Sequence, residues 1–79
     1  MLQKPFFIRA EWDEEARVWV ATSDDVPGLV TEASDMDSLI EKLKIIIPEL
    51  LEANKTVTTP DIPFELILRR FEVTQRLDI

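Results

Sequence analysis

The sequence of 79 residues contains no cysteine, no histidine and no tyrosine, and it has a single glycine. Without cysteine the chain has no disulfide framework and no thiolate site, which suits a reducing cytoplasm. Without histidine as well, the residue types of a hydrolytic triad are missing. No apolar run approaches the roughly 18 residues that span a bilayer, and residues 1–5 do not resemble a secretory signal. These absences favour a cytoplasmic protein and argue against a hydrolytic triad.

Basic residues are also scarce: nine face sixteen acidic ones, which gives a net charge of −7. Because lysine and arginine supply most of the affinity for phosphates, direct binding of nucleic acid is not expected. The negative field favours a basic partner. The plainer interpretation, which charge alone favours, is that excess acid keeps a small protein soluble.

The length predicts a single domain over residues 1–79, with a core at about 6–73 and a tail at 74–79. A chain this short buries only about 60% of its unfolded surface, so self-association would add stability. We therefore expect a homo-oligomer, a dimer or larger.

The lone glycine follows Pro27, and a Pro–Gly pair is typical of a type II turn, where proline sets φ and glycine accepts a positive φ. Asp24 and Asp25 precede this turn, and Thr31 and Glu32 follow it. The segment separates a predicted hairpin from the only strongly periodic helix.

Period-two alternation predicts strands at 6–12, 17–23, 29–33 and 64–73. The short polar segment between the first two predicts an antiparallel hairpin. Apolar residues fall on both faces of these strands, so one face should pack on a helix and the other should meet another chain.

A helix is predicted to begin at Ser34 or Asp35 as N-cap, with Asp37 in its first turn, and to end near Asn54. Its apolar stripe follows helical spacing, while Pro48 should bend it. The order β-β-β-α-β indicates an α+β fold of two layers, with one amphipathic helix packed on a mostly antiparallel sheet.

Several motifs resemble the HicB-type antitoxins. These are Trp19 and Ala21 in the second strand, the Asp25–Gly28 turn, Thr31, and the capped amphipathic helix. Three further segments are similar to a compact branch of that superfamily: Glu11–Glu15, Val26–Ala33 and Leu39–Leu43. The resemblance covers residues 6–70 and marks a fold more firmly than a function.

The resemblance implies a partial ribonuclease-H-like fold without catalytic power. It also implies a partner, HicA, which is a small basic toxin that cuts messenger RNA. Many HicB proteins carry a C-terminal DNA-binding segment, but only six residues follow Val73 here, so we expect none. Autoregulation by this chain alone is therefore not expected.

Two sets of site residues follow. For contact with a basic partner we expect Asp24, Asp25 and Glu32, with carboxylates in the places that RNA phosphates would take. For the oligomer interface we expect Trp19, Ile67, Phe71 and Val73. No catalytic, metal or cofactor site is predicted, because the acidic residues have explanations as turn and capping residues. Trp12 and Trp19 could stack on bases, but packing explains them better.

An alternative function is a homo-oligomer with a structural or regulatory role and no toxin partner. Such a protein could bind a small ligand between its helix and its sheet.

Overall fold

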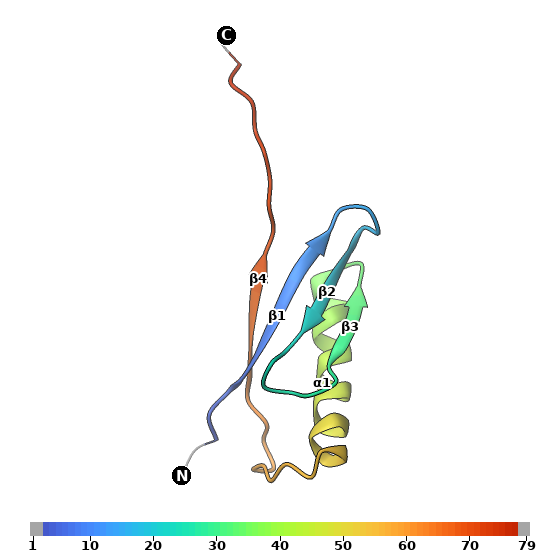
Figure 1. Cartoon of the computed structure of the whole chain (residues 1–79), viewed down its shortest axis with the longest axis vertical. Helices are drawn as coiled ribbons and strands as arrows, with labels where there is room; N and C mark the ends of the chain where they lie inside the picture. The colour runs from blue at the N-terminus through green and yellow to red at the C-terminus, as the bar shows by residue number, and fades with distance from the viewer. Residues whose placement is uncertain (1–2, 78–79) are drawn as a thin grey trace.

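The computed structural model describes residues 3–77. The strands are β1 (Phe6–Asp13), β2 (Val18–Thr22), β3 (Val30–Ala33) and β4 (Phe64–Arg69), and the helix is α1 (Met36–Ala53). The strands form one sheet in the order β3-β2-β1-β4, and α1 lies along one face of it (Figure 1). The predicted α+β architecture is confirmed.

The sheet is mixed because β4 runs parallel to β1, whereas β1–β2 and β2–β3 are antiparallel. The β1–β2 hairpin closes with the Arg17 N–H donating to the Asp13 carbonyl at 2.7 Å. The Asp13 side chain also accepts the N–H groups of Glu15 and Ala16, each at 3.1 Å. A parallel pair needs a long crossover connection, and α1 provides it between β3 and β4.

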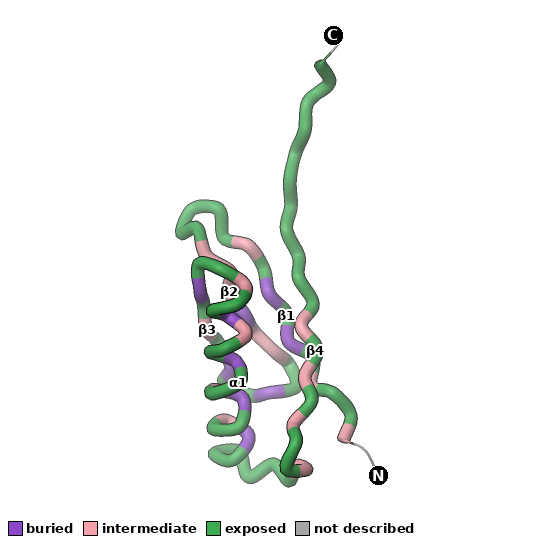
Figure 2. Tube along the Cα trace, turned by 180° about the vertical axis from the view of Figure 1, so that it is seen from behind, coloured by how far each residue is buried: buried purple, intermediate pink, exposed green. Residues whose placement is uncertain are grey.

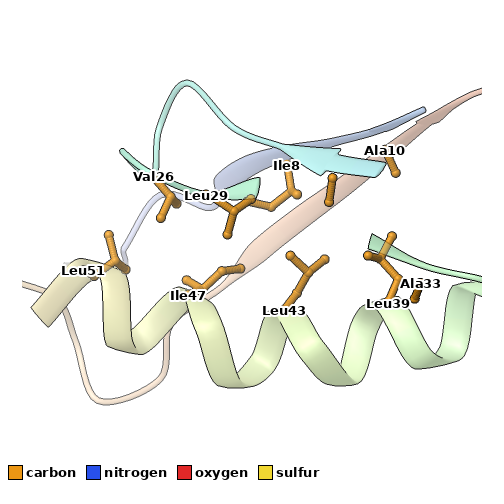
Figure 3. Packing of buried hydrophobic residues seen from close by; sticks show 10 residues of the cluster. Ile8, Ala10, Val26, Leu29, Ala33, Leu39, Leu43, Ile47 and Leu51 are labelled. Carbon is orange, nitrogen blue, oxygen red and sulfur yellow. The ribbon is translucent and has the colours of Figure 1, made fainter. Parts of the chain in front are cut away.

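The core lies between α1 and the inner face of the sheet (Figure 2). On the helix every fourth residue is buried, as the apolar stripe predicted: Leu39, Leu43, Ile47 and Leu51. Small side chains on three strands let the helix approach closely: Ala10, Ala21 and Ala33. Figure 3 shows the four buried side chains of α1 pointing towards the sheet. The helix therefore covers one face and leaves the other without a layer.

Both ends of α1 are capped by local contacts. Asp35 is the N-cap, accepting the Ser38 N–H at 2.8 Å and the Ser38 hydroxyl at 2.9 Å. At the other end Lys55 has a φ of 56°, and the Thr56 N–H donates to the Leu51 carbonyl at 2.9 Å. This is the geometry of a Schellman motif with lysine in the place that glycine usually takes. Pro48 does not divide the helix.

The Pro27–Gly28 turn is confirmed. Gly28 has a φ of 86°, and the Leu29 N–H donates to the Val26 carbonyl at 3.2 Å, as a type II turn requires. The Asn54 side chain donates to the Pro27 carbonyl at 3.2 Å, which ties this turn to the end of α1.

The last strand is shorter than predicted. It ends at Arg69 rather than at Val73, because the pairing with β1 stops at Glu11–Arg69. The following residues continue in the direction of β4 and leave the body of the molecule (Figure 1). We call residues 70–77 the C-terminal arm.

Candidate protein-binding surface

The face of the sheet turned away from α1, which we call the outer face, carries several apolar side chains. The register places them there because paired residues share a face: Phe7, Val18, Val20, Val30 and Ile67. Phe7 and Ile67 are each 51% exposed and lie on adjacent strands, Phe7 on the interior strand β1 and Ile67 on the edge strand β4. Single exposed apolar residues are ordinary, whereas a group of them on one uncovered face makes that face a candidate for contact with another chain.

Acidic side chains outnumber basic ones on this face. Glu11, Glu32 and Glu65 are exposed on β1, β3 and β4 respectively. The two arginines of the outer face have acidic neighbours: Arg9 makes an ion pair with Asp24 at 3.2 Å, and Arg69 is the β4 partner of Glu11. The face thus combines apolar residues with an excess of negative charge.

The three predicted partner-binding residues do not form one cluster. The Asp25 carboxylate accepts the backbone N–H of Phe7 at 2.8 Å, so it serves the fold. Asp24 is highly exposed beyond the end of β2, beside Arg9. Glu32 pairs with Val20 further along the sheet, on the edge strand β3. The turn aspartates and Glu32 are therefore separate. All three residues are exposed, and Asp25 is the one whose carboxylate accepts a backbone N–H.

The residues predicted for the oligomer interface do not share one surface of the chain either. Trp19 lies on the inner face, because it pairs with Trp12 and Ala33 and packs against the core. Ile67 lies on the outer face, as expected. Phe71 and Val73 lie on the C-terminal arm beyond the sheet, 86% and 73% exposed. The four residues therefore occupy three different places.

The tryptophans form a cluster at the hairpin end of the inner face. Trp12 and Trp19 meet edge to face with their ring centroids 5.4 Å apart. The guanidinium groups of Arg17 and Arg70 lie 5.3 Å and 4.5 Å from the Trp12 ring. The Trp12 Nε1–H donates to Glu14 at 2.6 Å, and this hydrogen bond, with help from Arg17, lowers the pKa of the Glu14 carboxyl. Packing, rather than stacking on bases, explains the pair.

A groove of about 750 Å³ opens between α1 and the segment that leads into β4. Its lining is mainly apolar: Leu43, Ile47, Pro48, Ile62 and Phe64. The sheet contributes only Phe64 to this lining.

Within residues 3–77 no group of three or more acidic side chains converges as a metal site would require. Among the same residues, no helix combines the length and the apolarity that crossing a bilayer requires.

Of the apolar residues on the outer face, only Ile67 was among the residues predicted for an interface. Its neighbours Phe7 and Val20 were not. The alternation did contain the signal for them, because Phe7 must face away from Ile8 and Val20 must face away from Ala21. The missing information was which phase of β2 faces the helix.

Comparison with known proteins gives relatives without a described function. A crystal structure of the hypothetical protein TTHA1013 from the extremely thermophilic bacterium Thermus thermophilus is similar, with 44% sequence identity and a TM-score of 0.71. That match covers 92% of this chain and 100% of the other. No curated protein matches. A family model described as "Domain of unknown function (DUF1902)" matches residues 5–75. The chain therefore belongs to the DUF1902 family.

Proposed function

We propose that this protein is a non-enzymatic module of the cytoplasm that binds a small basic protein through the outer face of its sheet. The observation that carries the proposal is the one-sided cover of the sheet. The helix buries the inner face, and Phe7 and Ile67 stay half exposed on the other face among acidic residues.

The composition of the outer face suits a protein partner. Protein interfaces combine an apolar centre with a polar rim, and complementary charge raises the rate and the specificity of association. Glu11, Glu32 and Glu65 supply carboxylates around the apolar residues, and the whole chain carries a net charge of −7. A basic partner matches this surface better than a nucleic acid does.

The resemblance of the Asp25–Gly28 turn and the surrounding motifs to HicB antitoxins suggests which basic partner this is. We propose a small HicA-like ribonuclease, whose RNA-binding surface would meet the carboxylates of the outer face. Asp24 and Glu32 remain available for that contact, whereas the carboxylate of Asp25 is engaged by the Phe7 N–H.

The test is recovery of the partner from the native host with a tagged chain and identification of what is bound. A small basic protein should be recovered with the original chain, and Glu32→Lys should reduce its recovery by about tenfold or more, as loss of a contacting charge does. The matched control is Glu49→Lys, which makes the same charge change on the exposed side of α1 and should leave recovery unchanged.

Equal recovery with both variants would contradict binding through the outer face. Recovery of no basic protein would contradict the proposed partner. If the recovered protein cuts messenger RNA, addition of the chain should stop the cleavage, while the chain alone with Mg²⁺ should leave RNA intact.

A second candidate function is favoured by the groove beside α1. Its apolar lining and open mouth suit a small apolar molecule, which would make the protein a ligand-responsive homo-oligomer without a toxin partner. A ligand of this kind should protect the groove-lining residues Ile47 and Phe64 from hydrogen exchange. Screening of apolar compounds with no stabilisation of the fold would contradict this candidate.

A further inference from the structure

The C-terminal arm gives the molecule an extended shape. The radius of gyration is 15.6 Å and the longest axis measures 57 Å, whereas a compact domain of this length has a radius of gyration of about 12 Å. Phe71, Val73 and Leu77 on the arm are 86%, 73% and 99% exposed. Three large apolar side chains exposed together on one short segment are typical of a surface that another chain covers.

The arm also has the pattern of a strand. In an extended chain Phe71, Val73 and Leu77 fall on one side, and Glu72, Thr74 and Arg76 fall on the other. The apolar side continues the phase of Ile67 in β4. Alternation predicted a strand as far as Val73, yet β4 ends at Arg69, where its pairing with β1 stops although β1 itself continues to Asp13.

The sheet offers a free edge next to the arm. In the order β3-β2-β1-β4, the strand β4 pairs with β1 on one side, and its other edge is open in a single chain. An open edge exposes a row of backbone N–H and C=O groups that another strand can pair with. The contact of Arg70 with the Trp12 ring fixes the base of the arm in line with β4 (Figure 1).

We infer that two copies of this chain pair antiparallel through β4 and the arm, so that the arm of each copy extends along β4 of the other. A two-fold axis perpendicular to the sheet joins the copies, and the two sheets become one. This inference does not depend on the proposed basic partner, since β3, which carries Glu32, lies at the opposite edge of the sheet.

Among two-fold axes at residues 70–72, where the arm begins, the charges favour one register. A two-fold axis at Arg70 would place the two Arg70 side chains opposite each other, and an axis at Glu72 would place the two Glu72 carboxylates together. Both arrangements are unfavourable, because like charges directly opposite destabilise a strand pair. An axis at Phe71 places the two Phe71 rings opposite each other and sets Arg70 opposite Glu72 of the other copy, twice. The same arrangement brings residues 65–69 of one copy beside residues 73–77 of the other.

The sequence around Phe71 is self-complementary, which indicates a second copy of the chain as the partner of this edge. A two-fold interface must be complementary to itself, and a central phenylalanine flanked by one arginine and one glutamate meets that condition. Within one chain Arg70 and Glu72 form an exposed ion pair at 2.5 Å. In the dimer two ion pairs between the copies replace it, each joining Arg70 of one copy to Glu72 of the other.

Disulfide cross-linking tests this pairing. Because the chain has no cysteine, a thiol introduced by substitution is the only thiol in the chain. In Phe71→Cys the two sulfur atoms would be close enough for a disulfide, since opposite Cα atoms of antiparallel strands are about 4.5–5.5 Å apart. The matched control is Val57→Cys, which places a thiol at another apolar position, 92% exposed in a loop.

Under mild oxidation at micromolar concentration, Phe71→Cys should form the cross-linked dimer at least about tenfold faster than Val57→Cys, because pairing holds its thiols at high effective concentration. Circular dichroism checks that both variants fold. Equal, slow cross-linking of the two variants would overturn the inference, as would an arm that cross-links to a different protein and never to its own copy.

Discussion

The carboxylate of Asp25 accepts the backbone N–H of Phe7, with 2.8 Å between Oδ2 and N. The Ser23 hydroxyl donates to the Phe7 carbonyl at 2.6 Å. The β1–β2 ladder ends at the Arg9–Thr22 pair, so two side chains extend the pairing of β1 where the backbone of β2 has turned away. An aspartate beside an exposed turn thus serves the sheet.

Asp25→Ala should therefore lower the free energy of unfolding by about 1 kcal/mol, the usual net value of a hydrogen bond. Asp24→Ala is the matched control, because its side chain is 95% exposed and makes only a surface ion pair with Arg9. Urea unfolding measures both. A loss with Asp24→Ala as large as that with Asp25→Ala would contradict the structural role of Asp25.

Gly28→Ala should destabilise the fold because of backbone conformation rather than crowding. The added Cβ would lie 3.7 Å from the nearest Leu50 carbon, which is ordinary contact, but the φ of 86° is unfavourable for alanine. We expect a loss of about 1–2 kcal/mol in thermal or urea unfolding. Gly28→Asn should lose less, since asparagine tolerates positive φ, and an equal loss for both variants would contradict this cause.

Lys55→Gly should stabilise the fold, the opposite of the effect expected for Gly28→Ala. Lys55 occupies the C′ position of α1 with a φ of 56°, where glycine avoids the strain of a side chain. The free energy of unfolding should rise by about 0.5–1 kcal/mol. Lys55→Ala is the control, because it removes the charge but keeps a Cβ at the positive φ. It should not stabilise the fold. If it stabilised the fold as much as Lys55→Gly, loss of the charge rather than relief of backbone strain would be the cause.

Asp35 should make stability depend on pH. Hydrogen bonds from the Ser38 N–H and hydroxyl hold the pKa of Asp35 below its ordinary value of 3.8. A group with a lowered pKa in the folded state stabilises the fold above its unfolded pKa, and that contribution is lost as pH falls through the folded pKa.

The measurement compares urea unfolding of the original chain with Asp35→Asn, which keeps a capping oxygen and does not titrate. The advantage of the original chain over the variant should be constant above about pH 5 and should shrink as the pH falls below about 4. The other carboxylates are common to both proteins, so the comparison isolates Asp35. A difference that stays constant down to about pH 3 would contradict the role of the ionised cap.

Local signals predicted the elements well, because each depends on neighbours in the sequence. The Pro27–Gly28 turn, the N-cap at Asp35 and the apolar stripe of α1 are of this kind. The face of Trp19 is different, since both phases of β2 are apolar and alternation alone cannot tell which one meets the helix. The hairpin register decides it by placing Trp19 opposite Trp12.

The end of β4 could not be predicted for a related reason. The alternation through Val73 is genuine, but a strand exists only where another strand pairs with it, and β1 offers pairs only as far as Arg69. In the same way, Asp25 carries the charge that a basic partner would bind, yet its carboxylate is used by a backbone N–H distant in sequence.

The most direct measurement is the mass of the chain in solution by light scattering at micromolar concentration. If the surfaces that α1 leaves uncovered bind protein chains, the original chain and Val57→Asp should both have twice the 9.2 kDa of one copy. Phe71→Asp should have the mass of one copy, because it places two carboxylates together at the two-fold axis. A mass of 9.2 kDa for the original chain at every concentration up to millimolar would contradict the pairing.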